Sequence, residues 1–358
     1  MTQSLFGVPT GQCGRKRKGS VLILVIWTLA LLSALALTLG YSVRQLLRGV
    51  QYLEVRDQLR FTAEAGVAKA VYVLKQVSGI QSSCDSLNDR WSRSEADFRD
   101  VPAGEGIFSV CYRPEGMSEP GEESSVVYGL VDEERKINLN RVKAISVLSK
   151  LFHFGAGLSD EEASALSASI LDWRDEDEVL NDGGAESRYY RGLHPGYKAK
   201  NAEFDTLEEL YFVKGVSPEV YRRIRPLVTL DSNGTVNVNT APASVLIATG
   251  LSENLAKKIL SFRSGRDKIE GTKDDRVFSD PATLAAELDG FLGLSDGEKE
   301  SLDSFGKSGA VSVLSENFTI CCSAHLRERR EALTVTCVVD RQGVVRRWHE
   351  RYHEWNGD

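Results

Sequence analysis

The sequence predicts an α+β fold in which an N-terminal membrane-spanning helix precedes an antiparallel sheet, and a large helical domain is inserted into that sheet. Three observations predict it. Residues 20–40 carry no ionisable side chain. Segments with strand-like alternation stand on both sides of the middle of the chain. Between them, residues 141–309 contain successive helical patterns that often begin after Ser, Asp or Thr and end at Gly.

The expected segments follow from these patterns. They are a leader at 1–19, a transmembrane and amphipathic helix at 20–77, the first part of an α/β domain at 78–137, an inserted helical domain at 138–310, and the second part of the sheet at 311–358. A chain of 358 residues is long enough for two or three domains with sizeable cores.

Composition narrows the functional classes. The formal net charge of −7 argues against a nucleic-acid-binding protein, which normally carries a basic face, and fits a carboxylate-rich site for a hard cation better. The six cysteines form no C-x-x-C pair, so a zinc or thioredoxin-like site is not indicated. One or two disulfides are compatible with an oxidising compartment, but the sequence does not pair the cysteines.

The N-terminal segment begins with four consecutive cations, Arg15 to Lys18, followed by Gly19 and a long apolar run. Twenty-one residues at ~1.5 Å each span ~31 Å, the thickness of a bilayer core. A secretory signal has a shorter apolar region, roughly 7–15 residues, although Ala34-Leu35-Ala36 keeps signal-peptidase cleavage open. A plain single-pass anchor is the simplest alternative, and the basic run predicts a cytoplasmic N-terminus.

This segment resembles a prepilin N-terminus, in which a short basic leader ends in glycine and the helix follows the cut directly. We expect processing between Gly19 and Ser20. Apolar residues continue at three- and four-residue steps from Leu46 to Leu74, so the helix should run on beyond the membrane. Most pilins carry Glu as the fifth mature residue, and Leu24 stands there instead. A subunit without that Glu need not dock beneath an earlier one, which suits the tip of a filament.

Strands are expected on both sides of the helical domain. Two precede it, at 106–113 and within 126–140, separated by a turn-rich acidic loop at 113–125. Three follow it, at 317–326, 331–341 and 344–355, with Gln342-Gly343 at a hairpin tip.

The helical domain contains an internal repeat. Residues 206–224 align with 241–259 at a constant offset of 35, and each copy reads as a helix, a glycine turn and a Ser-capped helix. The copies resemble helix-hairpin-helix or SAM-like units, but they lack the usual second glycine. Because the chain is acidic, a structural helical pair is favoured over DNA binding. The alternative function is a membrane-anchored, competence-type DNA-binding protein that uses these hairpins.

An acidic cluster is the most specific motif. Asp172, Asp175 and Asp177 are followed by a Gly-Gly turn that can return Glu186 to the same point. Carboxylates that converge repel one another unless a cation lies among them, and Ca²⁺ accepts 6–8 oxygen ligands in flexible geometry. The spacing is not that of an EF-hand, and a solvated acidic loop remains the alternative. For a second acidic loop at 265–278, a solvated turn is favoured over a second cation site. The number of calcium ions, and whether this loop binds one, stay open.

Together these segments resemble the K class of type II secretion minor pseudopilins. The residues that carry the resemblance are the leader with Gly19, Leu24, "LDWRDEDEVLNDGGAESRYY", "FDTLEELYFVKGVSPEVY" and "VNVNTAPASVL". The resemblance implies a pilin-like α/β fold with an inserted helical domain, and structural Ca²⁺ near Asp172 to Glu186. It also implies cleavage by prepilin peptidase with N-terminal methylation, an inner-membrane anchor with a periplasmic domain, and a tip complex with the I- and J-class pseudopilins.

In that interpretation the subunit caps a pseudopilus built from the major pseudopilin, helps to initiate its assembly and helps to push folded proteins through an outer-membrane secretin. No catalytic motif is present, so we expect a non-enzymatic protein without a nucleic-acid partner. Removal of the leader takes away four cations and changes the formal charge from −7 to −7 − 4 = −11. The secreted substrates, the host organism and the filament geometry are not readable from the sequence.

Overall fold

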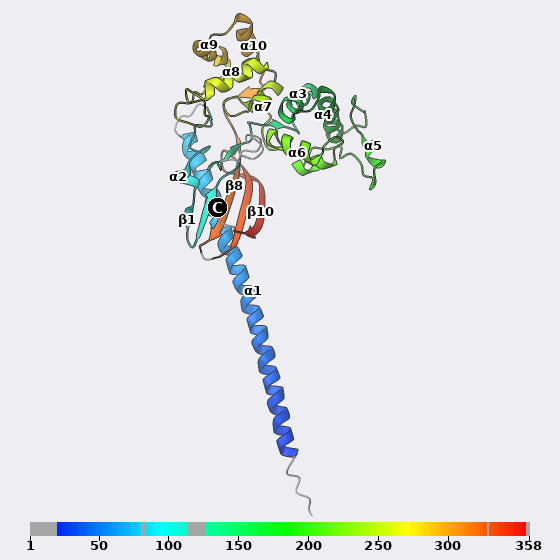
Figure 1. Ribbon diagram of the computed structural model, residues 1–358, viewed down its shortest axis with the longest axis vertical. Helices are drawn as coiled ribbons and strands as arrows, with labels where there is room; N and C mark the ends of the chain where they lie inside the picture. The colour runs from blue at the N-terminus through cyan, green and yellow to red at the C-terminus, as the bar shows by residue number, and fades with distance from the viewer. Residues whose placement is uncertain (1–19, 80–83, 114–125, 328, 356–358) are drawn as a thin grey trace, which may run out of the picture. The chain divides into compact units, whose positions relative to one another are not determined.

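The fold was analysed in a computed structural model that describes residues 20–79, 84–113, 126–327 and 329–355 (Figure 1). The leader with Gly19, and nearly all of the acidic loop at 113–125, lie outside the described residues. The chain divides into two units, Met1–Asp57 and Gln58–Asp358.

Helix α1 (Ser20–Gly79) is continuous over 60 residues and is long and apolar enough to cross a membrane. This confirms the predicted N-terminal apolar helix, which extends two residues further than expected. The predicted apolar stripe is confirmed only in the second unit, where Leu59, Ala63 and Leu74 are fully buried. Leu46 and Leu53 are at least 60% exposed, because no other described element of their own unit covers them.

The main sheet has six strands in the order β1-β2-β8-β9-β10, with β3 also paired to β8, and all pairs are antiparallel. The strands are β1 (Val101–Ala103), β2 (Gly106–Val110), β3 (Val131–Asp132), β8 (Asn317–Leu326), β9 (Glu331–Asp340) and β10 (Val345–Glu354). The three C-terminal strands lie where the sequence predicts them. Three strands rather than two precede the insert, because β1 was missed. It is short and contains Pro102, which lacks an N–H donor and suits an edge strand.

The second half of α1 packs on this sheet. A Cβ at Gly66 would overlap the Cys322 sulfur and the Phe108 ring, so only glycine allows the helix this close. Strand β8 alternates buried and half-buried residues, with Phe318 and Ile320 fully buried on the inner face. The alternation that predicted this strand from sequence therefore reflects one packed and one more open face.

Between β3 and β8 the chain is mainly helical (Figure 1). The helices are α3 (Ile145–Ala156), α4 (Asp160–Arg174), α5 (Ser187–Arg191), η1 (Leu207–Phe212), α6 (Pro218–Ile224), η2 (Arg225–Leu227), α7 (Ala243–Ala248), α8 (Glu253–Arg263), η3 (Pro281–Thr283), α9 (Leu284–Leu292) and α10 (Asp296–Lys307). Two-residue parallel pairs join β4 (Ile137–Asn138) to β5 (Val228–Thr229) and β6 (Val236–Asn237) to β7 (Val311–Ser312). The short α2 (Glu95–Phe98) precedes the sheet.

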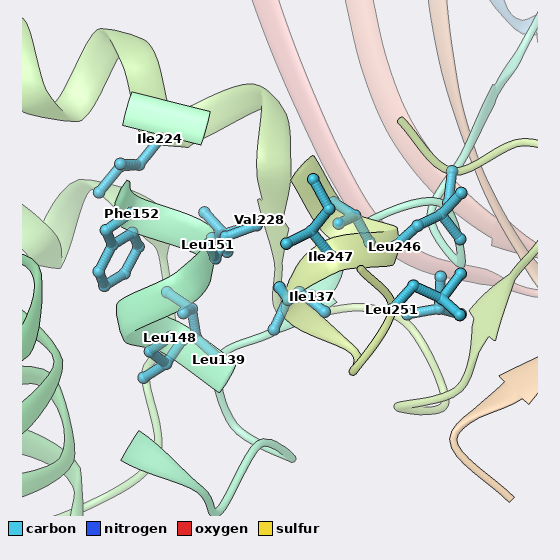
Figure 2. Close-up of a cluster of buried hydrophobic side chains, with 14 of the residues drawn as sticks. Ile137, Leu139, Leu148, Leu151, Phe152, Ile224, Val228, Leu246, Ile247 and Leu251 are labelled. Atoms are coloured by element: carbon cyan, nitrogen blue, oxygen red, sulfur yellow. The ribbon is translucent and has the colours of Figure 1, made fainter. Parts of the chain in front are cut away.

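One apolar core unites these helices (Figure 2). Side chains of α3, α6 and α7 meet in it, with Leu148, Phe152, Ile224 and Leu246 fully buried. The predicted helical character of this region follows from that burial, because each helix contributes one apolar face to a shared interior.

The two copies of the internal repeat have the expected order of elements. Ser217 and Ser252 cap α6 and α8 by accepting hydrogen bonds from the backbone N–H groups of Val220 and Leu255. The first helix of the first copy is η1, a 3₁₀ helix. Three basic residues of the copies form ion pairs: Arg223 with Glu219, Lys257 with Glu253 and Lys258 with Glu298. The helix-hairpin-helix or SAM-like assignment stays a prediction.

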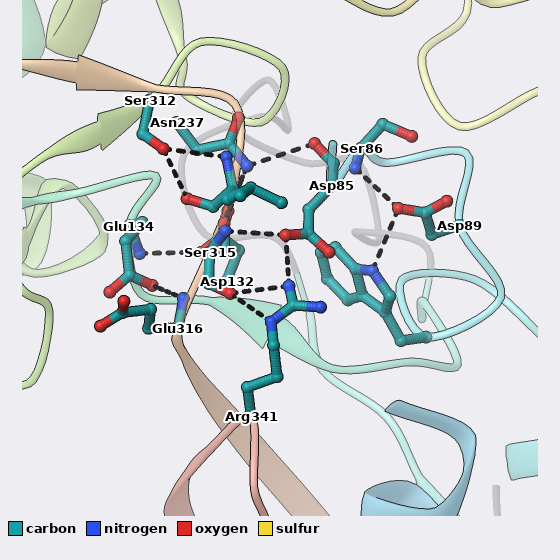
Figure 3. A network of polar contacts seen from close by, with 12 residues as sticks. Asp85, Ser86, Asp89, Asp132, Glu134, Asn237, Ser312, Ser315, Glu316 and Arg341 are labelled. Atoms are coloured by element: carbon teal, nitrogen blue, oxygen red, sulfur yellow. Dashed lines mark hydrogen bonds and ion pairs between the residues drawn. The ribbon is translucent and has the colours of Figure 1, made fainter. Parts of the chain in front are cut away.

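A buried polar network joins the insert to the sheet (Figure 3). The Ser315 hydroxyl donates to Asp132 Oδ2 at 2.7 Å and accepts from Asn237 Nδ2 at 2.8 Å. Arg341 pairs with Asp85, and its Nε donates to the Ser315 carbonyl at 2.9 Å. Residues of β3 and β6, the segment just before β8 and the residue just after β9 therefore share one set of hydrogen bonds, which fixes the junction.

Candidate metal centre

The acidic cluster forms where α4 ends. The N-terminus of α4 is fixed by a capping box. In it the Ser159 hydroxyl accepts a hydrogen bond from the Glu162 backbone N–H, and the Glu162 carboxylate accepts one from the Ser159 backbone N–H. The helix stops at Arg174, and Asp175 takes an extended backbone conformation as the C-cap. Asp172 therefore lies in the last turn, whereas Asp175 and Asp177 project from the chain beyond it.

The structure brings three of the four predicted ligands together. Carboxylate oxygens of Asp175, Asp177 and Glu186 all lie within 4.8 Å of one another. Glu186 reaches this point as the N-cap residue of α5, after the Gly-Gly turn. Asp172 is fully buried beside the group but is not among the three, because its Oδ1 accepts hydrogen bonds from the backbone and side-chain nitrogens of Asn181.

The residues present fit a bound cation. Asp172 Oδ2, Asp175 Oδ1 and both Glu186 carboxylate oxygens are buried and accept no hydrogen bond from any described residue. Buried carboxylate oxygens without donors are unfavourable unless a cation satisfies them. A Cβ at Gly184 would overlap Asp172 Oδ2, so the loop leaves open the space beside these oxygens.

The electrostatics of the cluster agree with this fit. Burial, reinforced by the charges of Asp172, Asp175 and Glu178, raises the pKa of Glu186 to about 7. Burial and the charges of Asp177 and Asp172 likewise raise the pKa of Asp175. The negative charges of the cation-free cluster therefore destabilise one another at neutral pH.

Sequence reasoning missed the residues that support the loop. Lys214 Nζ donates to the carbonyls of Gly183 and Gly184 at 3.1 and 3.0 Å. Asn201 Nδ2 donates to the Asp177 carbonyl at 3.1 Å, and its buried Oδ1 accepts no hydrogen bond from a described residue. Asn201 is therefore a further oxygen ligand candidate. Its left-handed backbone, with φ of 49°, is one that Asn tolerates well.

Aromatic residues that flank the acidic residues in the chain pack on one another. Trp173 meets Tyr190 edge-on with ring centroids 5.1 Å apart, and Tyr190 stacks on Tyr197 at 5.3 Å. The Tyr190 hydroxyl accepts a hydrogen bond from the Lys214 backbone N–H. The aromatic residues that flank the acidic motif in the sequence are the signal that could have predicted this packing.

The second acidic loop differs in one decisive respect. Asp267, Asp274 and Asp275 also bring carboxylate oxygens within 4.8 Å of one another, but Asp267 and Asp274 are exposed. Their oxygens accept local hydrogen bonds, including those from the Arg266 N–H and the Thr272 hydroxyl. Because these carboxylates are exposed and have local donors, a solvated turn stays the prediction for this loop.

Comparisons with known proteins agree with one another. Residues 128–232 match the family described as type II secretion system (T2SS), protein K. Type II secretion system protein K of Aeromonas hydrophila is 28% identical over 76% of this chain and 82% of its own length. The protein of the same name from Pseudomonas aeruginosa PAO1 is 26% identical over 93% of this chain and 92% of its own length.

The structural comparison gives the same fold. The crystal structure of the GspK-GspI-GspJ complex from the enterotoxigenic Escherichia coli type 2 secretion system contains a chain that matches with a TM-score of 0.59 and 16% identity. The match covers 84% of this chain and 99% of that one. The fold consists of an apolar N-terminal helix long enough to cross a membrane, an antiparallel sheet packed on the later part of that helix, and a helical insert. Along most of its length the chain is similar to type II secretion system protein K, and its residues 128–232 match the model of that family.

Proposed function

We propose that this protein is a non-enzymatic minor pseudopilin at the tip of the type II secretion pseudopilus, where it helps to start filament assembly and to push folded proteins through the secretin. The observation that carries the tip position is Leu24. No carboxylate is available there to pair with the N-terminal amine of a neighbouring subunit. The helical insert between β3 and β8 supports the same position, because a large added domain hinders addition of a subunit above it.

The partners follow from the same role. The matching chain comes from a solved GspK-GspI-GspJ complex, and we propose I- and J-class pseudopilins as neighbours of this chain. Prepilin peptidase would release the mature chain at Ser20, α1 would hold it once across the inner membrane, and the remainder would lie in the periplasm.

Co-purification and stoichiometry test this proposal. The full-length protein should co-purify with I- and J-class pseudopilins of the same system, and a maltose-binding protein fusion to the same membrane helix serves as the control. Sheared filaments should contain this chain in far smaller amounts than the major pseudopilin, and only at one end by immunogold labelling. Labelling along the whole shaft would contradict the tip position.

We also propose that the cluster of Asp172, Asp175, Asp177 and Glu186 holds a structural Ca²⁺, with Asn201 as a further candidate ligand. Two unit charges at ~4 Å repel by roughly 4 kcal/mol at an effective dielectric constant near 20. A calcium ion supplies positive charge that offsets this repulsion and binds the oxygens that have no hydrogen-bond donor. The orphaned oxygens described above support the proposal, and flexible oxygen coordination suits Ca²⁺ better than Mg²⁺.

Calcium-dependent stability tests the metal assignment separately from assembly. A ligand that binds only the folded state adds ~2.7 kcal/mol at a hundredfold excess over its Kd. The chelator-treated protein should melt at a lower temperature and recover with Ca²⁺ but poorly with Mg²⁺. Asp175→Ala combined with Asp177→Ala should abolish the response, whereas Asp267→Ala combined with Asp274→Ala should preserve it. No bound calcium by elemental analysis and no melting shift would refute the site.

A further inference from the structure

An open cleft lies where the sheet meets the helical insert. It has a volume of about 460 Å³. Its lining comes from the end of β2, from the β3–β4 turn, from the last turn of α3, from α6–η2 and from the start of α7, as follows: Tyr112, Arg113, Val131, Arg135, Lys136, Phe154, Gly155, Arg223, Pro226, Leu227, Pro242, Ala243 and Ser244. The metal centre shares none of these residues.

The charge of this cleft is opposite to that of the chain. Four of its lining residues are cationic and none is acidic, although the protein has 51 acidic and 44 basic residues. Lys136 is paired with Glu133 at 2.7 Å, and Arg223 is paired with Glu219. Arg113 and Arg135 make no ion pair with any described residue, so they supply the positive charge of the cleft.

The acidic residues of the same turn do not cancel that charge within the cleft, because their carboxylates point into the interior. Glu133 is buried and accepts hydrogen bonds from the hydroxyls of Thr229 and Thr319 at 2.5 and 2.7 Å. Glu134 is fully buried and accepts from the backbone N–H and side-chain amide of Asn317 at 3.0 and 2.9 Å. Both carboxylates thus accept hydrogen bonds from donors in the interior, so the guanidinium of Arg135 remains available to a ligand in the cleft.

The cleft also exposes apolar surface. Phe154 is 42% exposed at the end of α3, and Val131 and Leu227 are half-buried beside it. A simple inorganic anion would satisfy the arginines but would leave this surface in water. The lining therefore matches a ligand that presents carboxylates and an apolar side chain together, since guanidinium groups bind carboxylates with two parallel hydrogen bonds.

We propose that this cleft binds an acidic segment of a partner protein, with carboxylates facing Arg113 and Arg135 and an apolar side chain packed against Phe154. Charge complementarity favours a peptide of this composition over a basic or uncharged one. The contact is independent of the tip position and of the metal site, because neither argument uses these residues.

Designed peptides test the proposal with the full-length protein in detergent micelles. The probes are fluorescein-labelled GEEFEEG, GEEGEEG and GKKFKKG, followed by fluorescence anisotropy. GEEFEEG should bind most tightly, GEEGEEG at least threefold more weakly, and GKKFKKG not measurably. Binding of GEEFEEG should weaken as salt rises from 50 to 500 mM, because exposed charges are screened.

Substitutions then locate the contact. Arg113→Glu and Arg135→Glu should each weaken GEEFEEG binding at least tenfold, and Phe154→Ser should reduce it to the level of GEEGEEG. The matched control is Arg222→Glu, an exposed residue of α6 outside the cleft, which should leave the affinity within twofold of wild type. Thermal melts verify folding. If Arg135→Glu unfolds the protein, the exposed Arg113 decides the result.

Three outcomes would overturn the proposal. The first is absence of GEEFEEG binding under conditions in which the melting curve is that of the folded protein. The second is equal weakening by Arg222→Glu, which would indicate a nonspecific charge effect. The third is displacement of the labelled peptide by inorganic phosphate as effectively as by unlabelled GEEFEEG, which would indicate a small-anion site.

Discussion

Glu186 is the residue at which the metal centre couples most strongly to pH. Its pKa is raised to about 7 in the cation-free fold, mainly by burial, against roughly 4.3 in an unfolded chain. A carboxyl with a raised folded pKa stabilises the fold fully below the unfolded value, and this contribution is lost as pH rises through about 7. In chelator-treated protein, the unfolding free energy of wild type should therefore fall between pH 4.5 and 8 relative to that of Glu186→Gln.

Denaturant titrations across that pH range measure the difference, with Glu161→Gln, an exposed position in the first turn of α4, as the control. The Glu161 variant should follow wild type. Added Ca²⁺ should remove most of the wild-type loss, because the cation replaces the proton as the partner of the carboxylate. An identical pH profile for wild type and Glu186→Gln would show that this carboxyl is not perturbed.

Gly184 affects the metal centre by its small size and not by charge. Its backbone has no left-handed requirement, but a Cβ there would overlap Asp172 Oδ2 and lie 3.1 Å from the Asn181 carbonyl oxygen. Gly184→Ala should reduce the calcium affinity at least tenfold, because the added methyl group occupies the space beside the ligand oxygens. The measurement is a calcium titration followed by thermal melting. The control is Gly290→Ala in α9, where a Cβ meets nothing within 4 Å and calcium affinity should not change.

The candidate site was only partly predictable from sequence at the level of single residues. The four carboxylates were identified because acidic residues of one short segment must lie close together. Asn181 lies in the same segment but its role depends on the conformation of the loop. Asn201 and Lys214 come from later segments, and only the packing of the insert brings them to the loop. Single-sequence reasoning has no local signal for such contacts.

At the scale of elements, Asp97 joins α2 to α1. Its carboxylate is 5% exposed and pairs with Lys69 of α1 at 3.0 Å and with Arg90 Nη2 at 2.6 Å. The Arg90 guanidinium, helped by Ser94 and Lys69, holds the pKa of Asp97 well below its usual range. A lowered folded pKa gives stability that is present above the unfolded pKa of about 3.9 and lost as pH falls below it.

Asp97→Asn should therefore lower the unfolding free energy by about 1.5–3 kcal/mol at pH 7, the contribution of hydrogen bonds to a charged group. The loss should shrink as pH falls from 4 toward 2. Urea denaturation measures both effects. Glu95→Gln in the same helix removes an exposed pair with Arg99 and should lower the unfolding free energy much less. Equal effects of the two substitutions would rule out a special role for the α1–α2 contact.

The elements themselves were predictable in proportion to their length and regularity. Strand β8 was located to the residue because ten alternating positions define it. The paired strands β4 and β5 have two residues each, and they lie about ninety residues apart in the chain. No local sequence pattern therefore predicts their pairing. The 3₁₀ form of η1 was missed because its amphipathic pattern does not distinguish it from a short α-helix.

For the whole molecule, cleavage between Gly19 and Ser20 is the prediction to test. Gly19→Lys should leave the leader attached, because a long side chain does not fit a small-residue cleavage site. N-terminal sequencing of the purified membrane protein should begin at Ser20 in wild type and upstream of it in the variant. Gly40→Lys lies within α1, beyond the predicted cut, and its cleavage should stay normal. A mature chain that begins at Leu37 would instead indicate an ordinary secretory signal.

The placement of the insert has a consequence for how such a protein could arise. Asp132, at the end of β3, pairs directly with Phe318, near the start of β8, so the chain leaves and re-enters the sheet at neighbouring points. A tight turn could bridge them and leave a plain hairpin in the same hydrogen-bonding ladder. The sheet thus accepts the helical domain as a cassette, gained or lost at one hairpin tip without any change of strand order. A chain with a plain hairpin at this point and the present chain can therefore have the same sheet and differ only in the segment that connects β3 to β8.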